Sequence, residues 1–138
     1  DDQHGNPVKI QGVVKNITEG IWEDSEIRHG GYTKYNQGIT ALVETSNGGS
    51  IILTTLRQPP QSIGQITHIG IDPNKKQLIT TRGVILPRPA YDPFAAKTIL
   101  VNTKGTTTAD LKNLNFKNIE RKIYPINDPE FDIKVNNV

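Results

Sequence analysis

The feature that most constrains the fold is a pair of β-branched runs, residues 39–45 and 50–56, joined by the turn Ser46-Asn47-Gly48-Gly49. An Asn-Gly pair accepts the positive φ angles of a tight hairpin turn. Alternate residues of a strand point to opposite faces, so three apolar side chains of the first run share one face: Ile39, Ala41 and Val43. The segment therefore predicts an antiparallel hairpin.

Other segments carry weaker β patterns. Residues 8–17 alternate apolar and polar side chains and change phase after Gly12, which suits a strand with a bulge or bend. A second hairpin is predicted from residues 66–71 and 77–81, joined by a turn at Asp72-Pro73-Asn74. Residues 84–86 extend this β pattern, and residues 98–102 predict a further strand. The resulting fold class is all-β and mainly antiparallel, either a small β-sandwich or an OB-like barrel.

Helical signals are confined to the C-terminal part. Asp92-Pro93 predicts a short helical turn with Asp92 as N-cap, and residues 107–114 have the spacing of a capping box followed by about two turns. With 138 residues, one domain is expected. Its predicted parts are a leader over 1–7 and a single β domain over 8–138, with a core at 8–86 and an extension at 87–138.

The N-terminus motivates a prediction about compartment. The chain contains no Met or Cys and begins Asp1-Asp2, which indicates a removed export signal or a deliberate cut. A start just after a lipid-bearing Cys would look the same, so we expect an extracytoplasmic location with a possible upstream lipid anchor. No apolar run approaches the roughly 18 residues that a membrane span needs.

One polar cluster could carry chemistry. Glu23, Asp24 and Glu26 stand beside Arg28 and His29, and such carboxylates with an imidazole could bind a metal or perform acid–base catalysis. The alternative is an exposed charged loop, because the ligand ladder of a calcium loop is absent and one His makes no zinc site. We predict no metal, no cofactor and no catalytic residue.

The remaining candidates are surfaces. Residues 18–37 form either a long functional loop or an irregular edge hairpin, and its aromatics could anchor a protein partner. The alternating tail at 131–135 could add a strand to a neighbour's sheet. The partner-binding residues are then Trp22, Tyr32, Tyr35, Phe131 and Ile133.

A stretch rich in Lys and Arg supports an alternative to protein binding. Together with the loop aromatics it could bind single-stranded nucleic acid or oligosaccharide, as OB-folds do. Plugging one end of a small barrel or contacting a protein competes with that role for the aromatics. The basic residues are Arg57, Lys75, Lys76, Arg82 and Arg88. His68 is expected on the solvent side of the strand at 66–71.

The strand pattern resembles a family of envelope domains. The quoted segments are Ile10-Gln-Gly-Val-Val14, Ala41-Leu-Val-Glu44 before Asn47-Gly-Gly49, Ser62-Ile-Gly-Gln-Ile66, Ile69-Gly-Ile-Asp72 and Thr81-Arg82-Gly83. Their order is similar to the small periplasmic β domains of type IV pilus inner-membrane lipoproteins and of the type II secretion inner-membrane component. The resemblance covers residues 8–86 and implies an envelope assembly module.

The favoured hypothesis is therefore a non-enzymatic, extracytoplasmic protein-binding module of a secretion or pilus-type complex. Two alternatives stay open: the OB-like binding domain, and an enzyme of unknown class that uses the Glu23–His29 cluster.

Overall fold

The structure is a computed structural model that describes residues 6–28, 30–103, 114, 116–118 and 123–124. The chain divides into two compact units. One spans Pro7–Leu100 and holds every helix and strand described below; the other comprises Asp1–Asn6 and Val101–Val138. Of the predicted helix at 107–114 the structure describes only residue 114, and the predicted strand at 131–135 lies outside the described residues.

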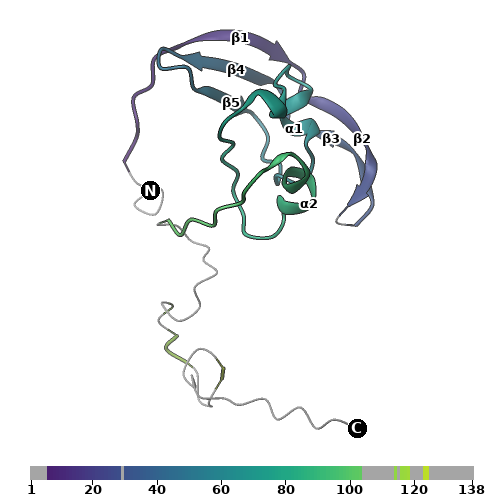
Figure 1. The fold of residues 1–138 in the computed structure, drawn as a ribbon, viewed down its shortest axis with the longest axis vertical. Helices are drawn as coiled ribbons and strands as arrows, with labels where there is room; N and C mark the ends of the chain where they lie inside the picture. The colour runs from purple at the N-terminus through teal and green to yellow at the C-terminus, as the bar shows by residue number, and fades with distance from the viewer. Residues whose placement is uncertain (1–5, 29, 104–113, 115, 119–122, 125–138) are drawn as a thin grey trace. The chain divides into compact units, whose positions relative to one another are not determined.

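A three-stranded antiparallel sheet forms the centre of the larger unit. Strands β1 (Gly12–Thr18), β4 (Thr40–Thr45) and β5 (Ser50–Thr54) lie in the order β1-β4-β5 (Figure 1). The predicted hairpin is confirmed as β4 and β5, with Ala41 opposite Leu53 and Val43 opposite Ile51. Its turn closes through the Thr45 N–H, which donates to the Gly49 carbonyl at 2.8 Å.

A second, two-stranded sheet settles the open question about residues 18–37. Strands β2 (Ile21–Arg28) and β3 (Tyr32–Asn36) pair antiparallel, so an irregular edge hairpin is present. The chain leaves and re-enters the main sheet at Gly20 and Gly38, both with φ of 67°. The backbones meet closely there, because a Cβ on Gly20 would lie 2.0 Å from the Gly38 carbonyl oxygen. Two glycines therefore mark the junction between the sheets.

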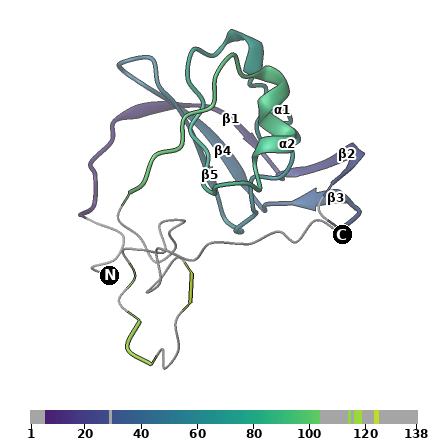
Figure 2. The same ribbon diagram turned by 60° about the horizontal axis from the view of Figure 1, so that its bottom comes forward.

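Short helices cover one face of the main sheet. They are α1 (Gly64–Thr67), η1 (Pro73–Lys75), α2 (Arg88–Tyr91) and η2 (Asp92–Phe94). Figures 1 and 2 show α1 and α2 near one another beside the sheet. The buried core joins Leu42 of β4 to Ile66, Ile69 and Ile71, and Ile52 and Tyr91 pack against it.

The second hairpin is a wrong prediction. Residues 66–71 end α1 and turn after it, and in the described part of the chain no strand forms at 77–81, 84–86 or 98–102. Ile63, Ile66 and Ile69 recur every third residue, which is a helical spacing, and their side chains pack on the core. The Asp72-Pro73-Asn74 turn does form, because the Asp72 carboxylate accepts the Asn74 N–H at 3.0 Å.

The fold class is confirmed as antiparallel β with a few short helices. Among the described residues the two sheets stay open, so the OB-like barrel is not formed. The helical turn at Asp92-Pro93-Phe94 is present as η2, but its N-cap is Tyr91 and not the predicted Asp92. Over the same described residues, no helix is long and apolar enough to cross a membrane.

Candidate functional site

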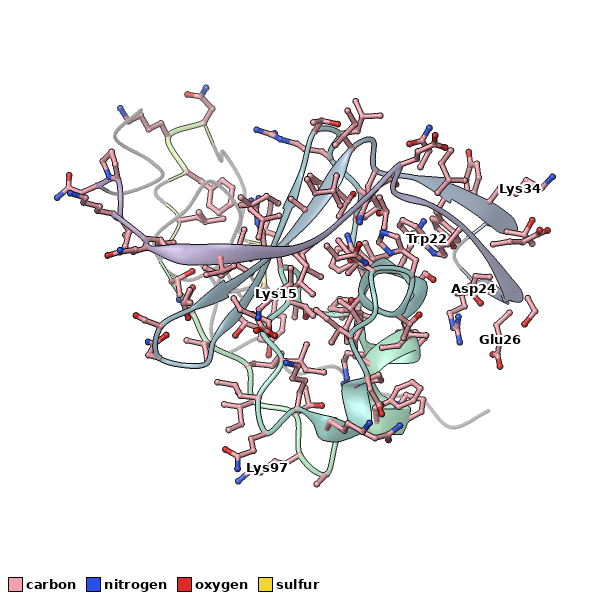
Figure 3. The ribbon with its side chains drawn as sticks, turned by 90° about the horizontal axis from the view of Figure 1, so that it is seen from above. Lys15, Trp22, Asp24, Glu26, Lys34 and Lys97 are labelled. Carbon is pink, nitrogen blue, oxygen red and sulfur yellow. The ribbon has the colours of Figure 1, made fainter. Side chains whose placement is uncertain are left out.

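Three aromatic rings stack where the β2-β3 hairpin meets α1. The Trp22 ring stacks on Tyr35 of β3, with ring centroids 5.2 Å apart, and on His68 at the end of α1, 4.9 Å away. Tyr35 is buried and Trp22 is half-buried. Figure 3 shows Trp22 and Asp24 on β2, on the side toward α1. The stack therefore joins two elements separated by about forty residues of chain.

A polar network runs alongside the rings and centres on the Ser62 hydroxyl. Ser62 is 1% exposed and donates to Asp24 Oδ2 at 2.6 Å. Its oxygen accepts the Trp22 indole N–H at 3.0 Å and the Gly64 N–H at 3.1 Å. The hydroxyl proton and both lone pairs are thus used within the network.

Asp24 is held by a second set of donors. Arg28 lies 2.9 Å from Asp24 Oδ2, and these side chains are only 15% and 10% exposed. Burial acts to raise the pKa of Asp24, but hydrogen bonds from Ser62 and the Glu26 N–H, together with the Arg28 guanidinium, outweigh it and lower the pKa. Asp24 is therefore held as a carboxylate.

His68 is occupied at both ring nitrogens. Nδ1 lies 2.7 Å from the Gly64 carbonyl oxygen, which can only accept, so Nδ1 carries the proton. Nε2 faces Gln37 Nε2 at 3.4 Å. Gln37 is fully buried, and its Oε1 has no hydrogen-bond partner among the described residues. The prediction of a solvent-side His68 on a strand is wrong, because the residue caps a helix and stacks on Trp22.

Serine, histidine and aspartate are the residue types of a hydrolytic triad, yet they are connected differently here. In a triad the imidazole takes the serine proton and the aspartate orients the imidazole. In this structure Asp24 contacts Ser62, while His68 contacts Gly64 and Gln37. The arrangement clamps the β2-β3 hairpin to α1 and leaves the serine buried.

Only some members of the predicted Glu23–His29 cluster contact one another. Arg28 joins Asp24 and also Glu26, at 3.1 Å, while Glu23 is exposed and His29 lies outside the described residues. Within the part of the chain that the structure describes, no three His, Cys, Asp or Glu side chains are close enough to hold a metal ion.

The predicted partner-binding residues are separated. Trp22 and Tyr35 belong to the stack, Tyr32 is 66% exposed at the start of β3, and Phe131 and Ile133 lie outside the described residues. Their role in partner binding stays a prediction. Tyr35 and His68 both stack on the Trp22 ring, so this aromatic surface is engaged within the domain.

The basic residues do not form one patch with the aromatics. Lys75 pairs with Asp72 at 3.6 Å, Lys76 donates to Ser50 Oγ at 2.8 Å, and Arg88 pairs with Asp92 at 2.9 Å. Arg57 and Arg82 are exposed and lie on the segment after β5 and on the loop before α2.

Sequence reasoning missed Ser62, Gly64 and Gln37. A Cβ on Gly64 would lie 2.1 Å from Trp22 Cδ1, so this glycine lets the indole approach α1. The available signal was the Ser62-Ile63-Gly64 turn before an every-third-residue isoleucine pattern, which indicates a helix start.

These features define a small antiparallel β domain whose polar residues hold its own parts together. A family model described as MlrC C-terminus matches residues 1–118, and the chain belongs to this family. No curated protein and no solved structure matches the chain.

The family corrects two predictions. The resemblance to pilus and secretion domains is wrong, since the matching family is a different one. The resemblance places Ile66 and Ile69-Gly-Ile-Asp72 on strands, whereas the structure has a helix and a turn there. The envelope assembly function inferred from that resemblance is overturned with it.

Proposed function

We propose that the chain serves as the C-terminal domain of an MlrC-type enzyme and acts there as a rigid scaffold, without supplying the reacting groups. The family description supports the first part. The family is associated with MlrC, a peptidase-like enzyme that degrades microcystin. We therefore propose that this chain is part of an enzyme of that kind.

The hydrogen bonds of Ser62 support the scaffold role. A nucleophilic serine needs an adjacent base and a free path to the substrate. Ser62 is 1% exposed and its proton is directed at Asp24, whose ion pair with Arg28 keeps that carboxylate engaged. Trp22, His68 and Gly64 are likewise occupied by contacts between β2 and α1.

The test separates a scaffold serine from a catalytic one. In the complete enzyme that carries this domain, Ser62→Ala is compared with Ser25→Ala, which alters an exposed serine of the same hairpin. We expect Ser62→Ala to lower the unfolding temperature, and microcystin hydrolysis to follow the folded fraction and recover on cooling. Ser25→Ala should change neither.

A catalytic role gives the opposite pattern. Removing a nucleophile lowers kcat by about 10³-fold or more while the protein stays folded. A folded Ser62→Ala enzyme with such a loss at every temperature would overturn the scaffold role. Full activity of an enzyme from which residues 7–100 had been deleted would overturn any role of this domain in the reaction.

A further inference from the structure

The face of the main sheet that points away from the helices is apolar. Two rows of directly paired residues cross it, one made of Val14, Val43 and Ile51 and the other of Ile17, Ala41 and Leu53. Val14, Ile17 and Leu53 are 53%, 63% and 56% exposed. We call these six residues the outer face.

A bulge in β1 builds this face. The register shifts between Val14 and Asn16, so that Asn16 pairs with Leu42 and Ile17 with Ala41. Val14 and Ile17 are three residues apart and would point to opposite faces of a regular strand. The bulge places both on the outer face and turns Asn16 inward, where its amide donates to the Ile69 carbonyl at 3.1 Å.

The outer face has the composition of a buried surface. None of its six residues is charged, and the opposite face, which contains Leu42 and Ile52, packs on the core. Removing aliphatic side chains from water is favourable, so such a face gains from being covered. Four of its members are β-branched, and Ile39, which is 64% exposed, immediately precedes β4.

The area of the face argues against a second copy of the chain. Strands about 4.8 Å apart that rise about 3.3 Å per residue give a face of roughly 15 Å by 20 Å, or about 300 Å². A pair of such faces would bury about 600 Å², well below the roughly 1,600 Å² of a stable complex. That area lies at the lower end of the 600–1,500 Å² range for domains of one chain, which a covalent link holds at high effective concentration.

We propose that the outer face is the surface on which the remainder of the MlrC-type enzyme packs, through a flat, apolar and uncharged surface of its own. This inference rests on the proposed function, because it takes its partner from the same enzyme. An uncharged partner surface is required, since no member of the outer face could compensate a buried charge.

Thiol labelling tests the packing directly, because this chain contains no cysteine. Cysteine is introduced as Ile17→Cys or Leu53→Cys, with Lys34→Cys as the exposed control on β3. Each variant is prepared as the 138-residue chain and as the complete enzyme, and peptide mass spectrometry follows labelling at the introduced site. Trp22 fluorescence verifies that each variant is folded.

We expect both outer-face cysteines to react at least tenfold more slowly in the complete enzyme than in the chain alone. The control cysteine should react equally in both. Equal rates at position 53 in the two proteins would overturn the proposal. So would slow labelling in the chain alone that becomes slower with concentration, because it would identify a second copy as the occupant.

Failure of the interface can be distinguished from failure of the proposed function. If labelling is slowed but Ser62→Ala behaves as a catalytic loss, the interface stands and the scaffold role fails. If labelling is unchanged while activity follows the folded fraction, the scaffold role stands and this interface fails.

Discussion

Gly64 shows how one missing side chain permits the contact between β2 and α1. A Cβ there would lie 2.1 Å from Trp22 Cδ1 and 2.3 Å from Nε1. Gly64→Ala should therefore displace the indole from Ser62 and destabilise the domain by about 1–3 kcal/mol, as overpacking does. Trp22 is the only tryptophan, so its fluorescence during denaturant unfolding measures both effects.

Thr67→Ala is the control for this substitution. Thr67 lies in the same helix and is exposed, so alanine should leave the emission maximum and the free energy of unfolding nearly unchanged. A Gly64→Ala protein with wild-type emission and stability would show that the indole is not packed against α1 as described.

The ionisation of Asp24 makes the contacts between β2 and α1 depend on pH. Its pKa is lowered in the folded chain: burial opposes this, but Ser62, the Glu26 N–H and Arg28 outweigh it. A lowered folded pKa contributes stability above the unfolded value, about 3.9, and that stability is lost as pH falls through the folded pKa. Asp24→Asn should be less stable by about 1–3 kcal/mol at pH 7, and the difference should shrink below about pH 4.

Chemical denaturation at several pH values measures this difference. Asp92→Asn is the comparison, because the hydrogen bond from Thr98 and the Arg88 contact also lower the pKa of Asp92, but its carboxylate is solvated and 36% exposed. Its effect should be much smaller. A constant gap between wild type and Asp24→Asn from pH 7 to pH 2 would contradict the assignment.

Among the elements, the hairpin β4-β5 is predictable from the sequence, because the alternation of its side chains and its Asn-Gly turn both indicate an antiparallel hairpin. The segment after Pro60 is not, since Ile66, Ile69 and Ile71 also fit a strand, whereas in the structure they pack on Leu42 of β4 from a short helix and the turn that follows it. The sequence groups Trp22 with Tyr35 in one segment, but it does not indicate that Ser62 and His68 join them, because the pattern at 66–71 predicts a strand. Local patterns do not record which distant residue supplies a hydrogen bond.

Gly38 lies at the junction between the two sheets, and we expect this position not to tolerate a side chain. Gly38 has φ of 67°, and a Cβ there would lie 2.1 Å from Thr55 Oγ1. Gly38→Ala should destabilise the domain by about 1–3 kcal/mol through backbone strain and through this steric contact. Gly30→Ala is a matched control, since Gly30 has φ of 96° and no heavy atom within 4 Å of an added Cβ.

Thermal unfolding separates the two contributions. Gly30→Ala reports the backbone strain alone, and the further loss in Gly38→Ala reports the crowding at the junction. Equal losses in both variants would mean that Thr55 does not crowd Gly38 as described.

At the scale of the whole molecule, the two faces of the main sheet differ in what covers them. The inner face is covered by the domain's own helices, and Leu42, 7% exposed, lies at its centre. On the outer face Val14, Ile17 and Leu53 are each more than half exposed. Substitutions on the two faces should therefore separate folding from association.

Leu42→Ala should cost about 2–5 kcal/mol by leaving a cavity in the core. Leu53→Thr, in the neighbouring strand on the outer face, should change the free energy of unfolding by less than about 0.5 kcal/mol, because its side chain is already 56% exposed. Denaturant unfolding of the 138-residue chain measures both values. In the complete enzyme, where we expect the outer face to be covered, Leu53→Thr should become the destabilising change, and an effect as small as in the chain alone would contradict that covering.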